Sequence, residues 1–203
     1  MNGLLIKMKI LNKYIFIIYC LFSILVSVNY SYAADNSKWL SINKKGMQSF
    51  RERDFLGSEK FYLKAIEEAK KSNLTTIFHA EDQNMLDYFK QFENNFKKSN
   101  PEIHNATRPA IAEALAISKI LNLNSIAKTK IHIAHVTSKI SLDIISYLQK
   151  KGQDISAETC PHYLFKTEKD VIKVGPFGKI NPPIRTKVDQ DELWKGFKNN
   201  SLS

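Results

Sequence analysis

Cysteine is scarce in this sequence of 203 residues, with only Cys20 and Cys160 present. Cys20 lies in an apolar N-terminal run that we interpret below as a removable segment. A single cysteine would then remain, which excludes an internal disulfide framework. Cys160 lies between a strand-like run and a proline, a setting more typical of a small buried hydrophobic residue than of a nucleophile.

Acidic residues are also few: 20 Asp and Glu stand against 30 Lys and Arg, for a net charge of +10. A basic chain can bind nucleic acid or an anionic membrane surface. Here the lysines are spread along the chain, and no arginine-rich stripe with interleaved aromatic residues occurs. We therefore expect a solvated, lysine-rich surface and no nucleic-acid partner.

No acidic residue occurs before Asp35, and this N-terminal stretch has the pattern of a targeting segment. Basic residues precede an uncharged run at 14–28, and Ser31-Tyr32-Ala33 supplies the small residues that a signal peptidase reads. We predict a signal peptide over residues 1–33 and a periplasmic or secreted location. The apolar run is shorter than the ~20 residues of a membrane span, so an uncleaved membrane anchor is the alternative.

Residues 34–72 follow as a helical segment, with apolar side chains at helical spacing from Phe50 through Tyr62 to Ala69. Their order weakly resembles one tetratricopeptide repeat, which is a helix–turn–helix unit. One such repeat cannot bury its own apolar face, and no second copy follows. A secreted helical interaction module, with the rest of the chain as a hydrolase remnant, is therefore one alternative function.

From Leu74 onward the pattern changes to alternating strands and helices. Strand-like runs are expected at 74–78, 130–134 and 153–157, helices at 84–97, 108–122, 139–151 and 189–198, and loops at 98–107 and around 181–183. This order predicts an α/β fold whose parallel strands are joined by crossover helices. Three strands form only part of a (β/α)8 barrel, which typically needs about 250 residues. We therefore predict a partial barrel over residues 73–203.

Two histidines follow the predicted strands directly. His79 comes after the strand at 74–78, and His135 ends the strand that begins at Lys130. In barrel enzymes the active site lies at the carboxyl ends of the strands, so both side chains would reach one site. Neutral imidazole is a common zinc ligand. The pattern alone leaves open whether they share a metal ion or are ordinary hydrogen-bonded histidines.

Five motifs in order extend this interpretation. In this order they resemble dihydroorotases and their relatives, the dihydropyrimidinases and allantoinases, over about residues 61 to 200. The motifs are His79-Ala80-Glu81-Asp82, Arg108-Pro109 with Ala112-Glu113, His132 to Ser138, Ala157 to Leu164 and Lys179 to Arg185.

The resemblance implies a (β/α)8 barrel that binds one or two divalent ions, usually zinc, and that opens or forms a cyclic amide such as dihydroorotate. It also implies that His79 and His135 are metal ligands after the fifth and sixth strands, and that Asn181 contacts the substrate. Asparagine before the paired prolines favours a dihydroorotase origin, and with it pyrimidine biosynthesis in the cytoplasm.

The other polar residues of these motifs receive structural interpretations. We expect Glu81 and Asp82 to be charges at a helix N-terminus rather than metal ligands. His132 is expected to be structural, and His162 to pack in a loop or to support the site. Arg185 has two interpretations, contact with a substrate carboxylate or an ion pair that anchors its loop.

Several parts that the resemblance implies do not occur in these residues. There is no His-x-His motif and no nearby arginine for the substrate carboxylate, and no aspartate follows an eighth strand. If residues 46–52 were a remnant of the fourth strand, Arg51 would stand near the carboxylated lysine, and a guanidinium cannot be carboxylated. We therefore predict a fragment that is inactive alone, unless a second chain supplies the missing strands.

Overall fold

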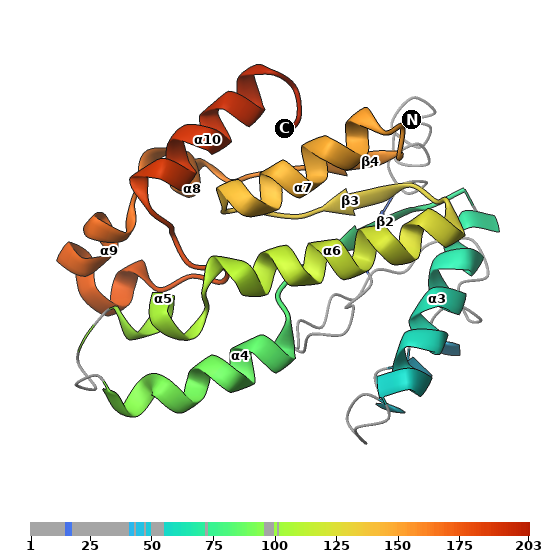
Figure 1. Cartoon of the computed structure of the whole chain (residues 1–203), viewed down its shortest axis with the longest axis horizontal. Helices are drawn as coiled ribbons and strands as arrows, with labels where there is room; N and C mark the ends of the chain where they lie inside the picture. Colours follow the sequence, from blue (N-terminus) through green and yellow to red (C-terminus); the bar gives the residue numbers. More distant parts are fainter. Residues whose placement is uncertain are drawn as a thin grey trace, which may run out of the picture.

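The computed structural model describes a parallel α/β unit with its helices packed on one face of a small sheet (Figure 1). The description covers residues 15–17, 41–42, 44–46, 48–49, 55–71, 73–95, 100 and 102–203. Most of the predicted signal peptide at 1–33 lies outside these residues, and so does Arg51.

Four parallel strands make up the sheet in the described part of the chain, in the order β1-β2-β3-β4. Their bounds are Ile15–Ile17 for β1, Thr75–Phe78 for β2, Ile131–Ile133 for β3 and Ile155–Ala157 for β4. The three strands expected from the sequence are confirmed as β2, β3 and β4. Strand β1 was not predicted, because it lies in the run that we interpreted as a signal peptide.

Helices connect the strands as crossover segments. They are α3 (Phe55–Lys71), α4 (Gln83–Lys90), α5 (Ile103–Thr107), α6 (Ala110–Ala127), α7 (Lys139–Lys150), α8 (Pro161–Phe165), α9 (Glu168–Val174) and α10 (Lys187–Lys198), with 3-10 turns η1 (Gln91–Asn95) and η2 (Gly175–Gly178). In Figure 1, α6 and α7 lie side by side in front of the strands, and α3 packs at one end of α6.

The structure differs from the sequence predictions of local structure in two places. The stretch 98–107 was expected to be a loop, yet α5 occupies its second half. Helices α8 and α9 were not predicted; each is too short for apolar periodicity and is fixed by a proline in the first turn or by the capping box of Thr167 and Asp170. The described residues at 44–46 and 48–49 are helical, as predicted for the segment 34–72, so the condition of a fourth-strand remnant is not met there.

The buried core joins α3 to the barrel-like part of the chain. Ala65 and Ile66 of α3 belong to the same apolar cluster as Phe78 of β2 and Ile117 of α6. A crossover helix of a parallel sheet packs in this way. The apolar face of α3 is therefore covered by the sheet and α6. The division into segments at residues 72 and 73 stays a prediction.

Burial alternates along the strands. The side chains under the helices are buried, and those on the opposite face, which include Ile77, His132 and Ser156, are half-buried or exposed. A parallel sheet covered on both faces would instead bury nearly every residue. One face of this sheet therefore lacks a complete cover in the described part of the chain, as the expected partial barrel requires.

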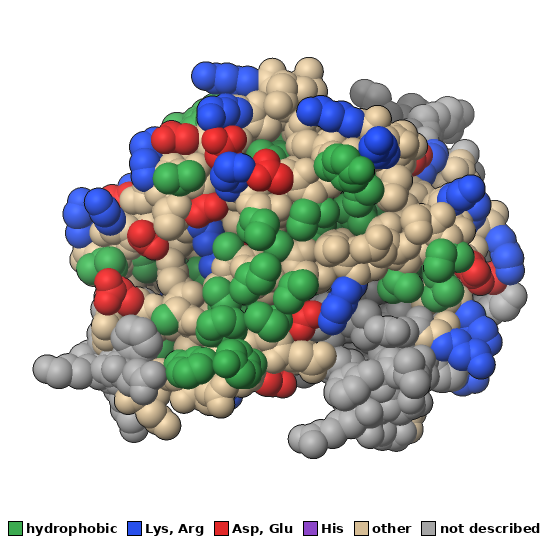
Figure 2. All heavy atoms as spheres, viewed as in Figure 1, with side chains coloured by type: hydrophobic (Ala, Val, Ile, Leu, Met, Phe, Trp, Pro, Cys, Tyr) green, Lys and Arg blue, Asp and Glu red, His purple; other side chains and the backbone are tan. Residues whose placement is uncertain are grey.

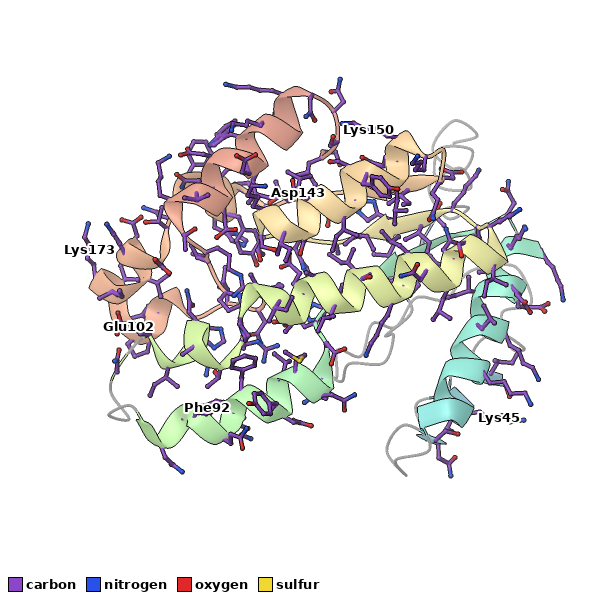
Figure 3. All side chains as sticks on the ribbon, in the orientation of Figure 1. Lys45, Phe92, Glu102, Asp143, Lys150 and Lys173 are labelled. Carbon is purple, nitrogen blue, oxygen red and sulfur yellow. The ribbon has the colours of Figure 1, made fainter. Side chains whose placement is uncertain are left out.

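The outer, helical surface carries a band of hydrophobic side chains with lysines around it (Figure 2). Large exposed apolar residues lie on α4, α6 and α7, among them Tyr88, Ile111, Ile140 and Tyr147. Figure 2 shows no histidine among the described side chains of this face. Figure 3 shows Lys150 and Lys173 at the periphery, at the ends of α7 and α9. The described histidines therefore lie away from this face.

Candidate metal centre

Two histidines from adjacent strands converge at the carboxyl edge of the sheet. Phe78 and Ile133 are register partners at the ends of β2 and β3, and His79 and His135 follow them. The Nδ1 atom of His79 lies 2.8 Å from Nε2 of His135, and the two rings meet edge to face with centroids 4.7 Å apart. The structure thus brings together both predicted metal ligands.

His135 has an unusual backbone conformation for its residue type. Its φ of 43° lies in the left-handed region, which side chains with a Cβ seldom adopt. Hydrogen bonds on either side fix the turn: Ala134 N–H donates to the Phe78 carbonyl, and Val136 N–H donates to the Glu158 carbonyl. Such strained residues cluster at functional sites. Burial and the neighbouring His79 lower the pKa of His135 to about 4, so its ring is neutral at pH 7.

The second nitrogen of His79 meets a buried carboxylate. Its Nε2 lies 3.1 Å from Oε2 of Glu81, whose side chain is only 1% exposed. Arg108 grips the same carboxylate with two donors, Nε to Oε1 at 3.1 Å and Nη2 to Oε2. Burial opposes ionisation of Glu81, but the hydrogen bonds from His79 and Arg108 outweigh it and lower its pKa to about 2. Asp82, in contrast, caps α4 as expected.

A second buried carboxylate holds the chain that follows His135. Glu113, in the first turn of α6, accepts hydrogen bonds from the backbone N–H and the hydroxyl of both Thr137 and Ser138. Arg185 donates from Nε to the Thr137 hydroxyl at 3.1 Å and from Nη1 to the Arg108 carbonyl. Arg185 is buried, which supports an anchoring role over contact with a substrate, but its contacts are hydrogen bonds to neutral groups rather than the expected ion pair.

Asn181 lies on a loop that the rest of the fold braces. His104 Nε2 is 2.7 Å from the Ile180 carbonyl, and Asn105 donates to the Ile184 carbonyl at 2.7 Å. Tyr163 donates to the Pro182 carbonyl at 2.8 Å. The Asn181 side chain is exposed. No pattern in the sequence pointed to His104, because the contact between α5 and this loop joins segments that are far apart in the chain.

The remaining candidates do not contribute to the histidine pair. The His132 ring hydrogen-bonds to the Ser156 hydroxyl at 2.9 Å and lies near Glu158, in keeping with a structural role. His162 packs against the ring of Tyr163. Cys160 has no disulfide partner, and burial raises the pKa of its thiol, which argues against a nucleophile.

The donor set suits a divalent ion in part. The two imidazole nitrogens are borderline ligands of the kind that zinc prefers, but the 2.8 Å between them is a hydrogen-bond distance, shorter than the roughly 3.3 Å between two nitrogen ligands of one tetrahedral zinc ion. Within the described residues, however, no group of three or more His, Cys, Asp or Glu side chains is placed to hold a metal. The histidines therefore fit two positions of a metal centre and leave the others unfilled.

A parallel α/β unit with paired histidines at its strand ends is the arrangement of a barrel segment, and the comparisons with known proteins agree with it. No family profile matches the sequence. An allantoinase of Rubrobacter xylanophilus is 31% identical over 130 residues, which are 64% of this chain and 29% of the relative. A dihydroorotase of Ruminiclostridium cellulolyticum is 32% identical over 147 residues, 72% of this chain and 34% of the relative.

A solved structure shows the same fold. The L-hydantoinase of Arthrobacter aurescens matches with a TM-score of 0.68 and 24% identity, over 71% of this chain and 32% of the hydantoinase. The chain belongs to the cyclic amidohydrolase family. It spans about a third of the length of the curated relatives that it matches.

Proposed function

We propose that this chain is a dihydroorotase-like part of a cyclic amidohydrolase and that it hydrolyses a cyclic amide only when donors outside its 203 residues complete the site. The observation that supports the proposal most directly is the pair of nitrogens, His79 Nδ1 and His135 Nε2, at the ends of adjacent parallel strands. Further support comes from the relatives, which are named as dihydroorotases, allantoinases and hydantoinases.

Each predicted site residue has a role in this proposal. His79 and His135 would hold a divalent ion such as zinc, and Asn181 would contact the polar edge of the cyclic amide. When bound, such an ion polarises a carbonyl and activates water for attack on it. The low pKa of His135 keeps its ring neutral, and therefore able to act as a ligand, throughout the physiological range.

The need for further donors follows from coordination chemistry. A catalytic zinc site uses about three protein ligands and keeps one position for water or substrate. Two histidines supply fewer than that. The incompletely covered face of the sheet is where the remaining strands of a barrel would pack, and a second chain that brings those strands is the partner we propose.

Metal titration of the full chain tests the binding half of the proposal. We expect one zinc ion to bind weakly, and the double variant with His79→Ala and His135→Ala to lose it. His132→Ala is the matched control, because it removes an imidazole from β3 that hydrogen-bonds to Ser156 instead. Equal zinc binding by the double variant and the wild type would overturn the proposed ligands.

Complementation tests the catalytic half. The full chain is co-expressed with the remainder of the Ruminiclostridium cellulolyticum dihydroorotase, from which the matching segment has been deleted. Turnover is then measured on dihydroorotate, hydantoin and allantoin. We expect no turnover from the chain alone and turnover of dihydroorotate from the pair, abolished by His79→Ala. Turnover by the chain alone would contradict the requirement for outside donors.

A further inference from the structure

Two buried carboxylates follow His79 closely in the sequence, and they make different contacts. Glu81 and Asp82 are each 1% exposed. Asp82 accepts from the Met85 backbone N–H at 3.1 Å and pairs with Lys119 at 2.6 Å, so it secures the start of α4. Glu81 instead contacts the ring of His79 and the guanidinium of Arg108. Only Glu81 is therefore placed to act on a predicted metal ligand.

We propose that Glu81, clamped by Arg108, is a positioning residue that fixes the ring and the tautomer of His79 so that Nδ1 faces the metal site. This inference rests on the proposed function, because it concerns the ion that His79 and His135 would share. Nothing in the sequence motif alone separates the two acidic residues, which we had both interpreted as helix N-terminal charges. Their contacts separate them.

The tautomer follows from what each group can donate. An ionised carboxylate only accepts hydrogen bonds, so the His79 nitrogen beside Glu81 has to carry the proton. That nitrogen is Nε2, at 3.1 Å from Oε2. In the neutral ring Nδ1 then presents its lone pair, and in the metal-free chain it accepts a hydrogen bond from Nε2–H of His135, 2.8 Å away. A carboxylate behind a ligating histidine also raises the basicity of the ligand.

Arg108 makes this arrangement rigid. Its two donors bind both oxygens of Glu81, a fork geometry that sets the plane of the carboxylate as well as its position. The Arg108 backbone is held in turn, since its carbonyl accepts a hydrogen bond from the buried Arg185. Arg108 also balances the negative charge of Glu81, which allows the carboxylate to stay ionised although it is buried.

The test compares Glu81→Gln with Asp82→Asn in the full chain, since both variants neutralise a buried carboxylate of this motif. Zinc affinity is measured by calorimetry, and the His79 tautomer by nitrogen-15 NMR of the metal-free chain. We expect Glu81→Gln to weaken zinc about 10- to 100-fold and to remove the preference for the proton on Nε2. Asp82→Asn is expected to lower thermal stability and to leave affinity and tautomer as in the wild type.

A third variant keeps the test decisive if Glu81→Gln does not fold. Arg108→Lys retains the positive charge but loses the two-pronged grip, so we expect a smaller, several-fold loss of zinc affinity. An unaltered zinc affinity in Glu81→Gln, or a wild-type His79 with its proton on Nδ1, would overturn the inference. A wild-type chain that binds no zinc would overturn the proposed function instead, and the NMR measurement would still decide the role of Glu81.

Discussion

Four charged side chains, three buried and one (Arg108) partly exposed, lie around the histidine pair. Glu81 and Arg108 act on the ring of His79, while Glu113 and Arg185 act on the chain after His135. Buried charges are tolerated when they are paired and fully hydrogen-bonded, and removing one partner of such a pair is costly. The stability of the site region therefore depends on single charged residues that hold the two histidine segments in place.

Glu113 offers the clearest prediction of this kind. In Glu113→Ala the backbone N–H groups of Thr137 and Ser138 lose their acceptor in a buried environment. We expect the free energy of unfolding to fall by about 2–4 kcal/mol, as measured by urea denaturation. Glu67→Ala, at an exposed position of α3, is the control and should change it by less than about 0.5 kcal/mol. Equal effects of the two substitutions would refute the anchoring role of Glu113.

The pH dependence of stability follows from His135. Its folded pKa is lowered from 6.5 to about 4 by burial and by His79, so the unfolded chain binds more protons between these values. Stability is therefore full above pH 6.5 and declines as the pH falls towards 4. Between pH 7 and pH 5 we expect a loss of about 2 kcal/mol, measured by urea denaturation in the presence of a chelator.

The variant His135→Asn removes this contribution, whereas burial also lowers the pKa of His104 and of His162, and these two groups stay in the variant. Its stability should therefore change less than that of the wild type between pH 7 and pH 5, with part of the slope retained. Glu81 does not interfere in this window, because its lowered pKa, about 2, costs stability only as the pH falls below 4.5. An equal slope in both proteins would show that His135 is not the group responsible.

The start of α6 supplies two of the residues that hold the histidine pair, Arg108 and Glu113. The sequence predicted the helix but not this role. Periodicity predicted the helix from Arg108-Pro109 onward, and the structure confirms it with Pro109 at the N-cap. The sequence did not show that Arg108 and Glu113, on either side of this cap, would reach two different histidine segments. That pairing depends on the packing of α6 against β2 and β3, which is a long-range contact.

The strands and the histidines at their ends were predictable for a different reason. Parallel strands are short apolar runs followed by loops, and their carboxyl ends meet at one edge. The placement of His79 and His135 side by side therefore followed from local pattern. The short helices α5, α8 and α9 could not be predicted in this way, because caps and tertiary contacts fix them rather than a periodic apolar face.

The C-terminal end of α6 supplies a prediction at the level of the helix. Lys128 follows it with a φ of 51°, in the left-handed conformation, and its N–H donates to the Asn124 carbonyl. A glycine adopts this conformation without the Cβ penalty, so Lys128→Gly should stabilise the protein by about 1 kcal/mol. Lys64→Gly, at an exposed position inside α3, should instead destabilise it by about 1 kcal/mol. Thermal denaturation of the pair measures the contrast in sign.

On the scale of the whole molecule, the incompletely covered face of the sheet bears on both the stability and the proposed activity. Its helices pack on one face, and its opposite face carries half-buried residues such as Ile77 and His132. A sheet of this kind gains stability when further strands and helices cover it. The same addition would bring donors to the histidine pair, so stability and activity should rise together in a complemented protein.

The N-terminus cannot serve both as a cleaved signal peptide and as a strand of the sheet. Strand β1, Ile15–Ile17, pairs with β2, yet it lies inside the predicted signal peptide. Cleavage after Ala33 would remove β1 and leave β2 at the edge of the sheet. A chain that has been exported and processed therefore cannot contain the four-stranded sheet, and a chain that keeps β1 has not been processed.

We predict export, because an uncharged run of about signal-peptide length follows a basic lead and precedes small residues. The chain expressed in a bacterium with its own N-terminus should be recovered from the periplasm, and N-terminal sequencing should begin at Ala34. Replacing Lys7, Lys9 and Lys13 with glutamate should block export while leaving the apolar run unchanged. If the chain is instead intact in the cytoplasm, with the amides of Ile15–Ile17 protected from hydrogen exchange, β1 belongs to the working fold, and β1 rather than β2 is the edge strand at that side of the sheet.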